Sequence, residues 1–134
     1  MSPVVAFALA SALHAGFQLT VTALVYPALA TRSAAGWADS HRRHTRAIAP
    51  LVVLVYGALV VTGGTLVADG PGPAGWAALG GAVLAFAATA FGAAPIHGRL
   101  GARDDALVAR LLLVDRWRCV AAVGGAVAAV LAAS

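Results

Sequence analysis

Long apolar stretches, separated by short polar segments, occupy most of this chain. They predict four membrane spans at about residues 3–30, 47–68, 74–95 and 107–133. A helix needs about 20 mainly apolar residues to cross the hydrocarbon core of a bilayer, and each stretch is long enough. The sequence therefore predicts one all-α domain over residues 1–134, a multi-pass integral-membrane four-helix bundle.

The segment before the second span is too polar for the bilayer but has the composition of a helix. We expect the second helix to begin near Ala34, with Ser33 as its N-cap, and to kink at Pro50 just inside the membrane. Pro27 is expected to bend or end the first helix in the same way.

Three spans carry paired glycines, which let helices approach each other closely. They predict either tight packing within the bundle or a homo-oligomer formed through glycine-rich helix faces. The pairs are Gly63-Gly64, Gly80-Gly81 and Gly124-Gly125.

The composition agrees with a membrane protein, since 61% of the residues are hydrophobic and only 10% are charged. The nine basic residues are all arginines, and the segment 69–75 between spans two and three contains none of them. By the positive-inside rule, the two basic loops should be cytoplasmic and both termini outside. Seven arginines support this orientation: Arg32, Arg42, Arg43, Arg46, Arg99, Arg103 and Arg110.

The basic charge does not indicate a nucleic-acid partner, because the stripes of aromatic and basic residues that such a site needs are absent. The single Cys119 excludes an intramolecular disulfide and a thiolate metal site, and we expect it only to pack. The first span has no basic residues before it, and its apolar stretch is longer than that of a signal peptide. We therefore expect it to be a membrane span and not a cleaved signal peptide.

Polar side chains within the spans carry the candidate chemistry, because lipid makes each of them costly. In the first span they recur every four residues and share one helix face, as His14, Gln18, Thr22 and Tyr26. In the fourth span, Asp115 and Arg118 are three residues apart and can pair on one face. Together with polar groups on the other two helices, they predict a cavity in the inner half of the bundle. This cavity should open to the cytoplasm or inner leaflet, with His14 at its floor.

These residues suggest an enzyme that binds a lipophilic small molecule between its helices. Asp115 would act as general acid or base, His14 with Gln18 would hold a carbonyl or hydroxyl group, and Arg118 would orient the carboxylate or an anionic group. His44 and His97 would line the entrance, with His44 as a second base, and Tyr26 completes the substrate-binding set. The alternative is that Asp115 and Arg118 form a purely structural ion pair in an accessory membrane protein.

The histidines leave a second class of site open. His41 and His44 are three residues apart and could face one metal ion, with His97 as a third ligand. The chain has no glutamate and no dense metal-binding motif, so we expect no cofactor. A metal-, haem- or quinone-binding protein remains the alternative.

A family resemblance is carried by two pairs of segments, Val25–Leu29 with Ser40–His44 and Pro95–Leu100 with Leu111–Arg118. The chain resembles small four-span bacterial membrane proteins similar to the anthrone-oxygenase-like family. In that family a Pro-x-(Asn or His)-x-x-Leu element after helix three precedes an Asn/Asp-x-x-Arg element in helix four.

The resemblance implies a tailoring enzyme of the bacterial inner membrane that oxygenates a polyketide, aromatic or isoprenoid-like substrate without a well-defined cofactor. The positions carried over are His97, Asp115 and Arg118. This chain has His97 and Asp115 where asparagine is usual, a change that could shift the chemistry toward proton transfer, and so toward an isomerase or cyclase.

Overall fold

The computed structural model describes residues 1–134 and contains four helical rods and no strand. Each rod is long and apolar enough to cross a membrane, which confirms the prediction of a multi-pass, all-α four-helix bundle. The first rod comprises α1 (Pro3–Thr20), the π-helical turn η1 (Val21–Val25) and α2 (Tyr26–Ala30), and the second is α3 (Ala34–Asp69). The third comprises α4 (Pro73–Ala87), the π-helical turn η2 (Ala88–Ala93) and α5 (Ala94–Arg99), and the fourth is α6 (Asp105–Ala133).

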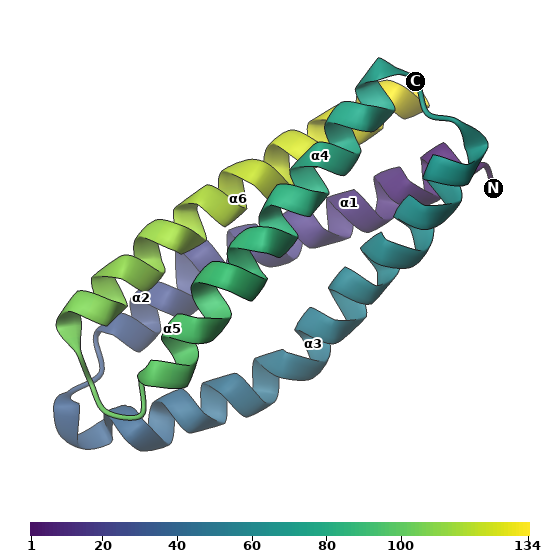
Figure 1. Ribbon diagram of the computed structural model, residues 1–134. Coiled ribbons are helices and arrows are strands. Elements are labelled where there is room, and N and C mark those ends of the chain that lie inside the picture. The colour runs from purple at the N-terminus through teal and green to yellow at the C-terminus, as the bar shows by residue number, and fades with distance from the viewer.

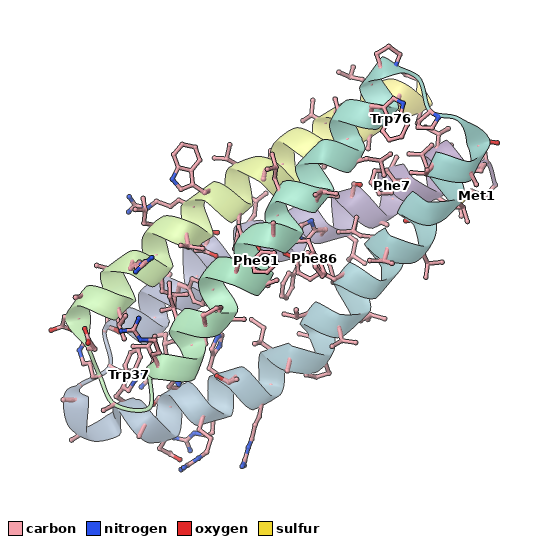
Figure 2. The ribbon with its side chains drawn as sticks, in the orientation of Figure 1. Met1, Phe7, Trp37, Trp76, Phe86 and Phe91 are labelled. Atoms are coloured by element: carbon pink, nitrogen blue, oxygen red, sulfur yellow. The ribbon has the colours of Figure 1, made fainter.

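The rods run up and down, so the links gather at two ends (Figure 1). The N-terminus, the C-terminus and the 70–72 link lie at one end, called the terminal end below. The 31–33 and 100–104 links lie at the other, called the basic end because of its arginines. Trp37 lies at the basic end, whereas Met1 and Trp76 lie at the terminal end (Figure 2).

Helix α3 begins at Ala34 and is therefore 13 residues longer at its start than the apolar span that begins near 47. The expected cap is present, because the Ser33 hydroxyl accepts a hydrogen bond from the Gly36 N–H at 3.4 Å. The helix continues through Pro50 and bends partway along its length (Figure 1). A proline within a helix lacks the N–H donor and crowds the preceding turn, which accounts for such a bend.

The other two proline positions are accommodated differently. The first rod does not end at Pro27 but continues to Ala30, since the turn before it widens into the π-helix η1. The third rod repeats this arrangement, with η2 immediately before α5 and Pro95 at the second position of α5. A π-helical turn shifts the hydrogen-bond register by one residue and is often found at functional sites.

Helices α4 and α6 pack closely against each other at Gly81 and Gly125. A Cβ atom added to Gly81 would lie 2.6 Å from the Gly125 Cα. This pair therefore packs within the bundle, as predicted. Gly80 and Gly124 face open space, so the homo-oligomer stays a prediction.

The helix surfaces fit a lipid environment. Many large apolar side chains are exposed, for example Leu54, Val60, Phe91, Val120 and Leu131. The buried apolar residues form two clusters, and the one at the basic end includes Val21, Tyr26, Trp37 and Leu100. Polar groups that lie between these helices must therefore find partners inside the protein.

Candidate functional site

Three polar side chains form a closed, buried cluster between α1 and α6. Gln18, Asp115 and Arg118 are 0%, 1% and 3% exposed. The Gln18 amide bridges the two charges, because its Nε2 donates to Asp115 Oδ1 at 2.7 Å and its Oε1 accepts from Arg118 Nη2 at 2.9 Å. The predicted ion pair is present, with Arg118 Nη1 3.8 Å from Asp115 Oδ1. Carboxylate and guanidinium fix the amide orientation, since the first only accepts and the second only donates.

A second chain of polar groups runs from this cluster toward the basic end. The Tyr26 hydroxyl lies 3.5 Å from Arg118 Nη1, which donates to it. Tyr26 also pairs with His97 Nε2 at 3.0 Å, and His97 Nδ1 pairs with His41 Nε2 at 2.9 Å. Three helical rods, carrying Tyr26, His41 and His97, thus contribute to one continuous hydrogen-bonded line.

One of the two proton arrangements that these contacts allow makes the line a proton relay from Tyr26 through His97 to His41. When the Tyr26 hydroxyl donates to His97 Nε2, the remaining N–H of His97 is on Nδ1 and donates to His41 Nε2. His41 then carries its N–H on Nδ1. Each imidazole receives a proton on one nitrogen and can release one from the other, which is the property of a proton relay.

Trp37 holds the outer end of this line in place. Its ring, 1% exposed, stacks on His41 with centroids 5.5 Å apart, and its Nε1 donates to the Leu100 carbonyl at 3.0 Å. The Arg103 guanidinium lies over the same ring at 5.7 Å and donates to the Ala30 carbonyl at 2.9 Å. These contacts tie both loops of the basic end to the helix that carries His41.

A cavity of about 620 Å³ lies alongside the polar line, between α3 and the other three rods. This is within the range typical of small-molecule sites. One part of its lining is apolar and includes Phe17, Val21, Ile48, Val52, Val53 and Ala93. The other part is polar and includes Tyr26, His41, His97, Arg118, Arg42, Arg46 and Thr89. A lipophilic molecule in this cavity would have its polar groups beside the relay.

The structure brings only some of the predicted site residues to this cavity. Tyr26, His97 and Arg118 line it, and their role in substrate binding stays a prediction. Gln18 and Asp115 do not line it. Asp115 instead hydrogen-bonds to Gln18 and pairs with Arg118, so it acts on the cavity through Arg118.

The expectation that His14 forms the cavity floor is wrong. His14 is 1% exposed, packs against the Tyr56 ring with centroids 4.9 Å apart, and is absent from the cavity lining. Its Nε2 has no hydrogen-bond partner within the protein. The cause is the position of α3, whose Tyr56 fills the space in front of His14.

His44 lies near the relay but opens onto a different surface. Its ring centroid is 5.9 Å from that of His97 and 6.0 Å from that of Tyr26. It lines separate grooves, one with Val25 and Leu29 and one with Ile48, rather than the large cavity. The prediction that His44 is a second base stays untested.

The three histidines proposed as metal ligands are neighbours, but they do not form a metal-binding group of histidine, cysteine and acidic side chains. Both ring nitrogens of His97 already have protein partners, Tyr26 and His41. A metal ion would have to replace these bonds.

Sequence reasoning assigned no role to Trp37 or Thr89, and it gave His41 only a role as metal ligand. The Tyr56 hydroxyl pairs with Thr89 Oγ1 at 2.6 Å, which joins α3 to η2 beside the cavity. No sequence signal marks Trp37, Thr89 or His41. Pro27 and Pro95 mark only where the first and third rods change register, beside Tyr26 and two residues before His97.

Comparisons of the chain with protein-family models, with curated proteins and with solved structures find no match.

Proposed function

We propose that this chain is a small enzyme of the bacterial inner membrane that binds a lipophilic substrate in the 620 Å³ cavity and removes a proton from it. The positive-inside pattern favours a cytoplasmic location for the basic end and an outer location for both termini. The observation that carries the proposal is the hydrogen-bonded line from Tyr26 through His97 to His41 along the polar wall of an otherwise apolar cavity.

In the proposed step, the Tyr26 oxygen takes a proton from a substrate carbon beside a carbonyl group. The proton of the Tyr26 hydroxyl passes to His97 Nε2 at the same time, and the proton on His97 Nδ1 passes to His41 Nε2. The electron pair of the broken C–H bond moves into the substrate and gives an enolate. The relayed proton leaves His41 as an imidazolium ion, which balances the negative charge of the enolate. Arg118, whose Nη1 lies 3.5 Å from the Tyr26 oxygen and which also lines the cavity, stabilises the enolate oxygen.

The fate of the enolate decides the type of reaction. Return of the proton to another carbon gives an isomer, attack on a second carbonyl gives a ring, and reaction with dioxygen gives an oxygenated product. The resemblance to the anthrone-oxygenase-like family supports the last outcome and a polyketide or polyaromatic substrate. All three outcomes share the same proton abstraction.

Asp115 has a positioning role in this proposal rather than the role of acid or base. Its carboxylate is 1% exposed and lies outside the cavity lining. It holds Gln18 by a hydrogen bond and Arg118 by an ion pair, and Arg118 in turn contacts the Tyr26 hydroxyl. The orientation of the guanidinium toward Tyr26 therefore depends on Asp115.

Proton abstraction can be tested before the substrate is known. The protein is reconstituted in lipid nanodiscs in D₂O and incubated without dioxygen with a lipid extract of bacterial membranes, and the extract is screened by mass spectrometry. We expect at least one carbonyl-containing compound to gain deuterium with the wild type and not with Tyr26→Phe.

The other tyrosine provides a matched control. Tyr56 hydrogen-bonds to Thr89 and the Ala85 carbonyl. It does not line the cavity, and it is not part of the relay. Tyr56→Phe should exchange as the wild type does. Exchange that is equal in all three proteins, or a compound that is retained by the protein but never exchanged, would overturn the enzyme proposal and favour a binding protein.

A further inference from the structure

The charges around the cavity indicate which lipophilic molecules it accepts. Its lining includes three arginines, Arg42, Arg46 and Arg118, and no acidic residue. The Asp115 carboxylate, which lies 3.8 Å from Arg118 and outside the lining, neutralises the charge of Arg118. The positive charge that is available to a ligand therefore lies on α3, at Arg42 and Arg46.

Acidic groups near these two arginines are too few to neutralise them. Asp39 is the only acidic residue that pairs in this part of α3, and it is shared between Arg42 at 3.1 Å and Arg43 at 2.5 Å. Arg46 makes no ion pair. One carboxylate against three guanidinium groups leaves an excess of two positive charges.

The apolar and basic parts of the lining follow one another along α3. The basic part begins at Arg42, and the apolar part extends from Ile48 to Val53. At about 1.5 Å of rise per residue, the distance from Arg42 to Val53 is about 16 Å. A molecule that fills the cavity would thus have an acidic group at one end and a hydrocarbon body beside residues 48–53.

We propose that the ligand of this cavity is a lipophilic anion, whose carboxylate or phosphate group binds Arg42 and Arg46 while its hydrocarbon body lies against the apolar wall. The inference rests on the proposed function for the identity of the site, and it adds the substrate class. The same chemistry is present in a free amphiphilic acid and in the headgroup of an anionic bilayer lipid. The free acid is the substrate in this proposal.

The test uses palmitate and hexadecanol, two probes of the same chain length that end in a charged carboxylate and an uncharged hydroxyl group. Native mass spectrometry of the protein, released from nanodiscs of zwitterionic phosphatidylcholine, measures the bound fraction of each probe. We expect one palmitate per chain and at least about tenfold weaker binding of hexadecanol, because a guanidinium–carboxylate contact forms only with the acid.

Variants locate the contact. The double variant Arg42→Gln with Arg46→Gln should bind palmitate at least about tenfold more weakly and should no longer prefer it to hexadecanol. Arg43→Gln is the control, since Arg43 lies on the same turn and pairs with Asp39 but does not line the cavity. Equal binding of both probes to the wild type, or equal loss in Arg43→Gln, would overturn the inference.

Further measurements distinguish a free acid from a bilayer lipid as the ligand, and distinguish failure of this inference from failure of the proposed proton abstraction. If phosphatidylglycerol displaces palmitate and depends equally on Arg42 and Arg46, the site holds a bilayer headgroup and the substrate assignment is overturned. Tyr26→Phe should still bind palmitate, because the anion contact does not involve the relay. Deuterium exchange into an uncharged compound without palmitate binding would refute this inference alone, whereas palmitate binding without any exchange would refute only the proposed proton abstraction.

Discussion

Replacing Asp115 by asparagine tests whether the charged cluster between α1 and α6 is as buried as described. The substitution keeps the shape of the side chain and an oxygen that can accept from Gln18, but it leaves Arg118 without its counter-charge. Two unit charges 3.8 Å apart interact by about 4 kcal/mol at an effective dielectric constant near 20. Removing one partner of a buried pair typically costs about 3–5 kcal/mol, so we expect a loss of that order in the free energy of unfolding.

The assay is reversible unfolding in mixed detergent micelles, followed by circular dichroism. Asp39→Asn is the control, because Asp39, like Asp115, forms ion pairs with arginine, but its side chain is 54% exposed. Exposed ion pairs contribute about 0–1 kcal/mol. The double variant Asp115→Asn with Arg118→Gln should recover part of the loss, since no uncompensated charge remains. A cost for Asp115→Asn no larger than that for Asp39→Asn would refute this account of the cluster.

Three further substitutions test the packing of the helices. Gly81→Ala should lower the free energy of unfolding by about 1–3 kcal/mol, since its Cβ would lie 2.6 Å from the Gly125 Cα. Gly80→Ala is the control, because a Cβ there meets nothing within 4 Å, and it should leave stability unchanged or raise it by up to about 1 kcal/mol. Equal thermal unfolding temperatures for the two variants would contradict the close α4–α6 contact. Trp37→Phe should cost about 1–3 kcal/mol because it leaves the Leu100 carbonyl without its donor, and an unchanged unfolding temperature would show that this bond does not hold the basic end together.

The four rods could be predicted because lipid imposes a strong and simple constraint on sequence. Every span must be mainly apolar and helical, so the number of spans and the class of fold follow from hydropathy alone. The start of α3 at Ala34 could also be predicted, because Ser33 is a recognisable cap. These features depend on local sequence and not on how the rods meet.

The arrangement of the site could be predicted only in part. The four-residue spacing correctly placed Gln18 and Tyr26 on the inner face of the first rod. The depth of each polar group, however, depends on the π-helical turns η1 and η2, which rotate the residues that follow them. It also depends on α3, whose Tyr56 ring packs against His14 and whose residues between His41 and Val53 line the cavity.

For the same reason, the sequence predicts for Asp115 a role as acid or base that the geometry does not favour. A lone carboxylate in an apolar helix is costly, so it needs partners. The sequence does not show whether the carboxylate also faces a cavity or is surrounded by those partners. The structure encloses it with Gln18 and Arg118. From the sequence, in contrast, His41 is a candidate only as a metal ligand, yet it is 8% exposed and ends the relay.

The most direct test of the relay is the rate at which deuterium from D₂O enters the exchanging compound, measured with His97→Gln beside the wild type and Tyr56→Phe. Glutamine preserves a polar side chain but cannot accept a proton on one atom and release another as imidazole does. General acid–base groups contribute about 10²–10⁴-fold, so the account predicts at least a hundredfold slower exchange in His97→Gln and wild-type exchange in Tyr56→Phe. Exchange in His97→Gln at the wild-type rate would contradict the proposal that Tyr26 passes its proton through His97.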